Sequence, residues 1–232
     1  MKERPIGLTI LNILSTILLG SSLYLSLVFA PTEVNMGNVQ RIFYTHVSVG
    51  WVGMMGFLLA MIAGIIYLIK SDKKWDIISL AGVEVGLVFC LLNIISGSVW
   101  AKATWNTWWI WEPRLITATI MELIYIAYMM LRQSIDEPGR RARFGAIYAI
   151  IGFISVPLTF FSIRIWNTIH PVVIASGDAG ADSGMSMSSD MRIAFFFALF
   201  TFTVIGVTLL WHRIRLGFLS DKIEILKMKM MD

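Results

Sequence analysis

The 232-residue chain is 57% hydrophobic and only 15% charged, whereas soluble domains average about 45–50% apolar and about 25% charged residues. This composition excludes an ordinary soluble domain and indicates an integral membrane protein. The net charge of +4 gives no reason to expect a nucleic-acid partner, because basic loops that flank membrane spans contact anionic lipid headgroups.

Six apolar runs are each long enough to cross a bilayer as a helix, for which about 20 residues suffice. In chain order they cover 7–30, 44–69, 76–100, 114–131, 144–163 and 192–211. We expect each to be α-helical, because only a helix satisfies its own backbone polar groups in lipid. The first run is longer than the apolar core of a signal peptide and lacks an A-x-A site, so we interpret it as a retained helix. The predicted fold is an all-α integral membrane domain of six transmembrane helices.

Lys and Arg are distributed unequally between the two sides that six spans define. The side that holds both termini carries 14 of the 19 basic residues, and the other side carries five. Because short cytoplasmic loops are enriched in Lys and Arg, we expect both termini to be cytoplasmic. The three outer loops are then 31–43, 101–113 and 164–191, and the second of them, between the third and fourth helices, is rich in Trp.

The end of the chain has an apolar face among charged residues. Five apolar residues recur at helical spacing with three lysines among them: Leu216, Leu219, Ile223, Leu226 and Met230, with Lys222, Lys227 and Lys229. This pattern is typical of an amphipathic helix. We therefore divide the chain into a six-helix transmembrane domain, 1–211, and a cytoplasmic amphipathic tail, 212–232. The tail would lie on the membrane surface or bind a cytoplasmic partner.

Tryptophan is concentrated in one segment of the second outer loop, WNTWWIWEPR, at residues 105–114. With Trp100 just before it, this region holds five of the nine tryptophans. An aromatic belt at the lipid headgroups explains one or two Trp per helix end, but it does not explain five beside an acid and an arginine. The alternative interpretation is a flat apolar surface for a flat apolar ligand with charged edges.

The other two outer loops each contribute one histidine. His46 lies in RIFYTHVSVGW near the outer start of the second helix, and His170 lies in IRIWNTIHPVV after the fifth. Two histidines and a Trp surface are the parts that haem binding needs, because imidazole is a common axial ligand of haem iron and aromatic rings pack on the porphyrin. Haem propionates would pair with outer basic residues, for which the candidates are Arg41, Lys102, Arg114 and Arg164. The chain has no C-x-x-C-H motif, so covalent haem attachment is not expected.

In these three segments, the chain resembles the CcmC family of c-type cytochrome biogenesis proteins, whose members carry a Trp-rich "WWD" motif. The resemblance covers essentially the whole chain, with six spans and the order His, Trp motif, His. The CcmF and CcsA proteins share the Trp motif but are longer, and this chain has no room for their extra spans. Two positions depart from the family pattern: Asn106 replaces the usual Gly, and Glu112 replaces the usual Asp.

The resemblance implies a non-enzymatic role in haem handling. It implies that His46 and His170 are the axial ligands, and that the haem-contacting motif consists of Trp105, Trp108, Trp109, Trp111, Glu112 and Arg114. The protein would present transiently bound, transferable haem b on the outer face of the bacterial cytoplasmic (inner) membrane. It would deliver this haem to the chaperone CcmE, beside the ABC transporter subunits CcmA and CcmB and the small protein CcmD.

Polar residues inside the spans allow further interpretations. In the third span, Gly82, Gly86 and Asn93 share one helical face, which predicts close helix packing with Asn as an interhelical hydrogen-bonding residue. Glu84 lies on the opposite face, and Glu122 lies in the fourth span. Intramembrane acids are rare and often functional. These two would be hydrogen-bonded buried acids, line a haem path or bind a partner.

Two other functions remain open at this stage. A b-type cytochrome-like redox subunit would also bind haem, but electron transfer across the bilayer normally needs ligands at both depths, and the middle of the spans contains no His. A solute permease with an aromatic outer gate would need ionisable residues at a midplane site. Glu84 and Glu122 leave the permease open, although it does not explain the paired outer histidines.

Overall fold

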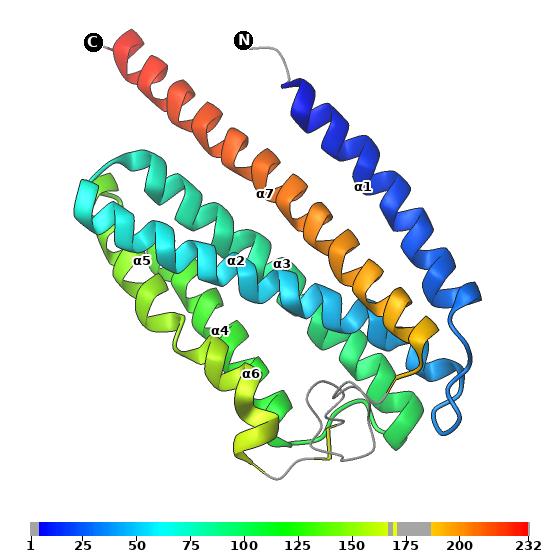
Figure 1. Ribbon diagram of the computed structural model, residues 1–232. Coiled ribbons are helices and arrows are strands. Elements are labelled where there is room, and N and C mark those ends of the chain that lie inside the picture. The colour runs from blue at the N-terminus through cyan, green and yellow to red at the C-terminus, as the bar shows by residue number, and fades with distance from the viewer. Residues whose placement is uncertain (1–4, 167–168, 171–186, 232) are drawn as a thin grey trace.

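Helices make up most of the computed structural model, which describes residues 5–166, 169–170 and 187–231 (Figure 1). The α-helices in these residues are α1 (Ile6–Tyr24), α2 (Ile42–Lys70), α3 (Lys73–Trp105), α4 (Pro113–Gln133), α5 (Pro138–Gly152), α6 (Ser155–Ile165) and α7 (Ser189–Met231). A π-helical turn, η1 (Leu25–Phe29), extends α1, and a 3₁₀ turn, η2 (Asn38–Arg41), precedes α2. The described residues contain no β-sheet.

Six helical segments of this part of the chain are long and apolar enough to cross a membrane: Ile6–Phe29, Asn38–Lys70, Lys73–Trp105, Pro113–Gln133, Pro138–Ile165 and Ser189–Met230. The predicted all-α class and the six predicted spans are therefore confirmed. The third helix is longer than predicted, because α3 continues to Trp105. The Trp-rich segment is thus partly helical, and the loop proper is only 106–112.

The fifth predicted span is not one helix, because α5 ends at Gly152 and α6 begins at Ser155. Pro157 explains the break. In a continuous helix it could not donate a hydrogen bond to the carbonyl of Phe153, and its ring would clash with that carbonyl. In the first turn of α6 the missing N–H costs nothing, since that donor has no partner within the helix.

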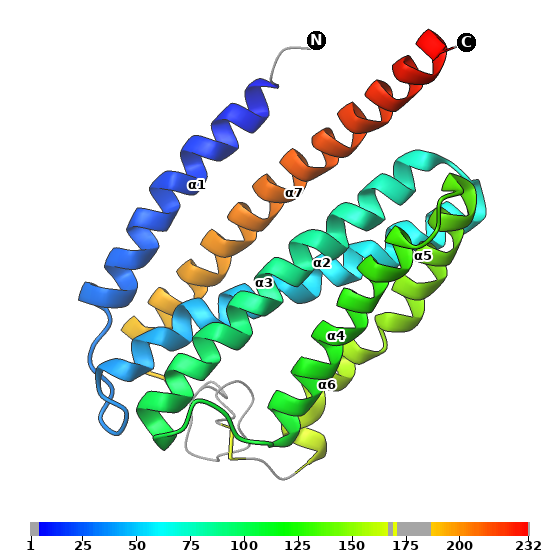
Figure 2. The ribbon, with the colours of Figure 1, turned by 180° about the vertical axis from the view of Figure 1, so that it is seen from behind.

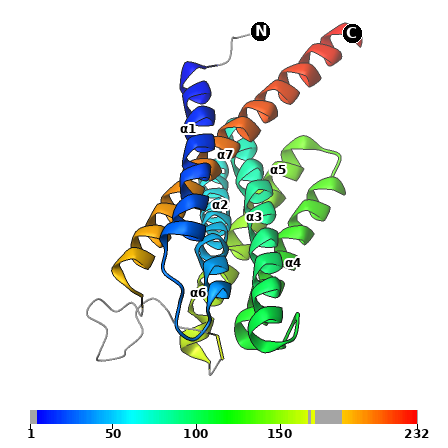
Figure 3. The same ribbon diagram turned by 90° about the vertical axis from the view of Figure 1, so that its right-hand side faces the viewer.

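Both termini lie at one end of the bundle, here called the terminal end, and loop 106–112 lies at the opposite end, here called the Trp-loop end (Figures 1 and 2). Helices α1 and α7 run side by side, α2 and α3 form the centre, and α4–α6 cover the other side (Figure 3). Polar contacts hold α1 on α7: Ser15 Oγ lies 3.1 Å from Thr208 Oγ1, and His212 Nε2 lies 3.0 Å from Asn12 Oδ1.

Small residues bring α2 and α3 together at backbone distance. A Cβ atom on Gly56 would lie 2.8 Å from the Gly82 carbonyl oxygen, and a Cβ on Gly82 would lie 2.7 Å from that of Gly56. Farther toward the Trp-loop end, Asn93 Nδ2 donates a hydrogen bond to the backbone oxygen of His46 at 2.7 Å. The predicted packing face of the third span is confirmed, with Asn93 as its hydrogen-bonding residue.

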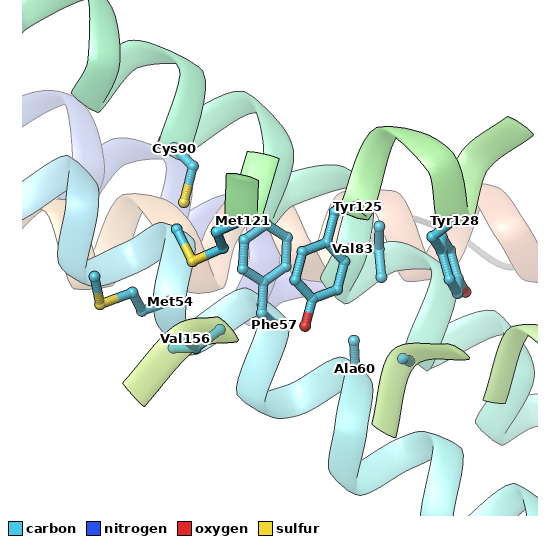
Figure 4. Close-up of a cluster of buried hydrophobic side chains, with 10 residues drawn as sticks. Met54, Phe57, Ala60, Val83, Cys90, Met121, Tyr125, Tyr128 and Val156 are labelled. Carbon is cyan, nitrogen blue, oxygen red and sulfur yellow. The ribbon is translucent and has the colours of Figure 1, made fainter. Parts of the chain in front are cut away.

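An apolar cluster joins this central pair to α4 (Figure 4). The rings of Phe57 and Tyr125 are stacked with centroids 3.5 Å apart, and Met54, Val83 and Met121 pack in the same cluster. The central pair and α4 are therefore positioned relative to each other by a buried contact below the Trp-loop end.

Helix α7 continues without a break through residues 211–212, so the predicted tail is its last part. The apolar stripe of the tail is exposed: Leu226 is 59% and Met230 is 86% exposed. The third predicted outer loop, 164–191, falls largely outside the described residues, although His170 is inside them.

Candidate functional site

His46 lies on the second turn of α2 and contacts α3. Its Nδ1 atom is 3.0 Å from Ser96 Oγ and 3.3 Å from Asn93 Nδ2. A Cβ atom at Gly97 would come within 2.9 Å of His46 Cε1, so only glycine leaves room for the ring at this position. Since these hydrogen bonds engage Nδ1, Nε2 is the ring nitrogen suited to ligation.

His170 is surrounded by parts of the Trp-rich segment. Its ring centroid lies 6.2 Å from that of Trp100 and 6.3 Å from that of Trp105. Its Nδ1 atom lies 3.4 Å from Oε1 of Glu112, a carboxylate that is only 7% exposed. His46 is close enough to His170 to interact with it electrostatically. The structure therefore brings both candidate ligands, although far apart in sequence, to the Trp-loop end.

The tryptophans divide into a packed group and an exposed group. Trp105 meets Trp100 edge to face, with centroids 5.0 Å apart and planes at 84°, and both lie beside His170. Trp109 packs edge to face on Trp111 at 5.8 Å. Trp108 is 59% and Trp111 is 77% exposed. The packed group would position a histidine, whereas the exposed group offers flat apolar surface.

Asn106 ends α3 in the left-handed conformation, with φ at 58°. Glycine adopts this conformation without strain, and asparagine adopts it more readily than most other residues. The side-chain and backbone oxygens of Asn106 also accept hydrogen bonds from Lys102 Nζ, at 3.0 and 3.1 Å. Replacing the usual Gly therefore leaves the turn intact, and Lys102, a candidate propionate partner, closes the end of α3.

The candidate arginines make contacts with the protein itself. Arg114 donates from Nη1 to the Thr159 carbonyl at 2.5 Å, which ties the start of α4 to α6. Arg41 donates from Nε to Asn38 Oδ1 at 3.1 Å and contacts the Leu27 carbonyl. Arg164 lies over the ring of Phe160. A guanidinium has five N–H donors, so these contacts leave capacity for a carboxylate.

The two intramembrane acids do not join the histidines. Glu84 pairs with Arg213 of α7, with Oε1 2.7 Å from Nη2. Both residues line a cavity of about 380 Å³ at the terminal end, beside the buried ion pair of Asp76 and Arg132. Glu122 is 7% exposed and close enough to the Cys90 thiol to interact with it electrostatically. Its Oε2 has no hydrogen-bond partner within the described residues.

The sequence reasoning missed Ser96 as a neighbour of the candidate ligand His46. A signal for it exists, because Asn93, Ser96 and Gly97 follow one another at helical spacing toward the outer end of α3. This spacing continues the small-residue face, but only the packed structure shows which residue of α2 lies opposite.

Comparison with known proteins settles the family. A family model described as CcmC, Heme exporter protein C, matches residues 5–229. The chain belongs to the CcmC family. Heme exporter protein C of Bradyrhizobium diazoefficiens is 29% identical over 214 residues, which cover 92% of this chain and 80% of that protein. The protein of the same name from Escherichia coli K12 is 29% identical over 188 residues, covering 81% of this chain and 74% of its own.

Membership of the CcmC family confirms the expected class of function. This is a multi-pass membrane protein for haem export in cytochrome c biogenesis, and the family is a haem-handling transport and assembly family rather than a catalytic one. A ccmC-like mitochondrial protein of cytochrome c biosynthesis from Arabidopsis thaliana is 30% identical over 149 residues, 64% of this chain and 56% of that protein.

Proposed function

We propose that the Trp-loop end holds haem b between His46 and His170 and presents it to the chaperone CcmE. The observation that carries the proposal is the pairing of both rings at Nδ1. His46 faces the Ser96 hydroxyl at 3.0 Å, and His170 faces the Glu112 carboxylate at 3.4 Å. Metal-bound histidines typically direct their second nitrogen to such a partner, which fixes the ring and strengthens the ligand.

The residues around the histidines also suit the shape and charge of haem. Trp108 and Trp111 expose flat apolar surface on which a porphyrin would pack. Arg114 interacts electrostatically with Glu112 and His46, so its positive charge lies where a propionate would need it. Haem would supply an iron with two axial positions. The imidazoles would bind it without a covalent bond, as a cargo that must be passed on requires.

The direction of delivery follows from the distribution of charge. With both termini in the cytoplasm, the Trp-loop end faces outward, where c-type cytochromes receive haem. We propose CcmA, CcmB and CcmD as partners in the membrane on the basis of the family. The pairing of Glu84 with Arg213 at the terminal end gives that acid a role in joining α3 to α7, which weakens the permease interpretation.

The proposal is tested with the detergent-solubilised full chain. Haemin is titrated into wild type, His46→Ala, His170→Ala and, as a matched control at the other end of the bundle, His212→Ala. We expect a Soret band in wild type and in His212→Ala, and a weakened or shifted band in the other two variants. Absence of haem binding by wild type would overturn the proposal. Unchanged spectra in both ligand variants would favour the redox-subunit alternative, with ligands elsewhere.

A further inference from the structure

Three residues of α3 surround the imidazole of His46. Ser96 Oγ lies 3.0 Å from Nδ1, Asn93 Nδ2 lies 3.3 Å from it, and Gly97 leaves the space that the ring occupies. Gly50, one turn along α2 from His46, makes room for Asn93, because a Cβ there would come within 2.7 Å of Nδ2. The contact between His46 and α3 is thus closely packed, and its hydrogen bonds decide where the ring carries its proton.

The serine hydroxyl has one proton to donate, and two backbone carbonyls compete for it. Ser96 Oγ lies 2.8 Å from the Leu92 oxygen and 3.1 Å from the Asn93 oxygen, both nearer the geometry of a donated bond within its own helix. With its proton directed to the backbone, the hydroxyl offers a lone pair to His46. Ser96 is therefore suited to accept a hydrogen bond from a protonated Nδ1.

Asn93 favours the opposite proton position. Its Nδ2 donates to the His46 backbone oxygen at 2.7 Å, which fixes the amide with the nitrogen toward the ring. The second N–H of that nitrogen faces Nδ1, where it could donate only to an unprotonated nitrogen. A neutral imidazole without a proton on Nδ1 carries it on Nε2 and cannot ligate a metal through Nε2. The two neighbours thus select between a ligating and a non-ligating tautomer.

We propose that Ser96 is a positioning residue for His46, which accepts the Nδ1 proton and keeps Nε2 available to haem iron against the competing donor Asn93. This inference rests on the proposed function, since it takes His46 as a ligand. Without the serine oxygen, a protonated Nδ1 would face the amide N–H of Asn93, and an unsatisfied buried donor is costly. The ring would then shift to the tautomer that presents N–H, rather than a lone pair, to the iron.

The experiment titrates haemin into the detergent-solubilised full chain carrying Ser96→Ala, His46→Ala, or both. The matched control is Ser98→Ala, which removes a hydroxyl about 200° further round the same helix. We expect Ser96→Ala to weaken haem binding about tenfold and to shift the spectrum toward that of His46→Ala. Added imidazole should restore the six-coordinate spectrum in both variants, and the double variant should bind no more weakly than His46→Ala alone.

Each contrary result has a distinct meaning. If Ser96→Ala binds haem as wild type does while His46→Ala is impaired, the role of Ser96 is wrong and the proposed function stands. If the two losses multiply in the double variant, or if imidazole fails to restore the Ser96→Ala spectrum, Ser96 acts by another route and the inference is overturned. If His46→Ala binds normally, His46 is not a ligand, and both proposals lose that residue.

Discussion

Glu112 Oε1 lies 3.4 Å from Nδ1 of His170, so the acid of the Trp-rich segment faces an imidazole from a different loop. The carboxylate is buried at the start of α4, and His170 also contacts Trp100 and Trp105. This relationship gives the acid a concrete task, because a carboxylate beside the second nitrogen of a histidine orients the ring and increases its basicity as a ligand.

The first prediction concerns the charge of this acid. Glu112→Gln keeps the size of the side chain but removes its charge, so we expect haem affinity to fall about tenfold while thermal stability changes little. The measurement is a haemin titration, compared with Glu224→Gln in the exposed tail. Wild-type haem affinity in Glu112→Gln would show that the carboxylate does not act on His170.

The second prediction concerns the turn that follows Trp105. Asn106 has φ of 58°, so Asn106→Gly should retain full stability, whereas Asn106→Val should lose about 1–2 kcal/mol, because side chains other than those of Gly, Asn and Asp are strained there. Thermal unfolding in detergent compares the two. Equal unfolding midpoints would mean that the loop adopts another conformation.

The spans and the Trp–His pattern could be predicted because both are local features of the sequence. Apolar runs of about 20 residues are visible without neighbours, and so are His46, His170 and the tryptophans between them. The break before Pro157 was also locally encoded, but hydropathy alone does not record the missing N–H.

Pairings between helices could not be predicted in the same way. Glu84 finds Arg213, and His46 finds Ser96, only after α3 has packed on α7 and on α2. The spacing of glycines on α3 predicted a close contact but not the helix that makes it. For the same reason the acid at position 112 had a motif in the sequence but no partner, since His170 reaches it from a separate loop.

The third prediction tests the close contact of α2 with α3. A methyl group on Gly56 would meet backbone atoms, the Gly82 oxygen at 2.8 Å and the Gly86 Cα at 3.0 Å. Because backbone cannot move aside as a side chain can, Gly56→Ala should destabilise the protein by about 1–3 kcal/mol. Gly20→Ala is the matched control, since nothing lies within 4 Å of its added methyl. Equal unfolding midpoints for the two variants would contradict this packing.

The fourth prediction concerns the ion pair of Asp76 and Arg132, whose side chains are 12% and 7% exposed and joined by hydrogen bonds of 2.9 and 2.5 Å. Arg132→Met leaves a buried carboxylate without its partner, and we expect a loss of about 3–5 kcal/mol. The double variant Asp76→Asn/Arg132→Met removes both charges and should recover most of that loss. Chemical denaturation measures both, and a double variant as unstable as the single one would show that packing, not charge, dominates.

The last prediction separates the two groups of tryptophans. Trp105 packs on Trp100 and lies beside His170, so Trp105→Ala should lower both thermal stability and haem affinity. Trp111 is 77% exposed, so Trp111→Ala should leave the unfolding midpoint unchanged. If its ring belongs to the haem platform, Trp111→Ala should still weaken haem binding, and Trp111→Phe should retain most of it because a flat ring remains. If Trp111→Ala binds haem as tightly as wild type while Trp105→Ala does not, the haem site is confined to the packed tryptophans around His170. The exposed ones would then contact lipid headgroups or a partner protein, because a solvent-facing indole that does not bind the ligand is typical of a membrane interface or a docking surface.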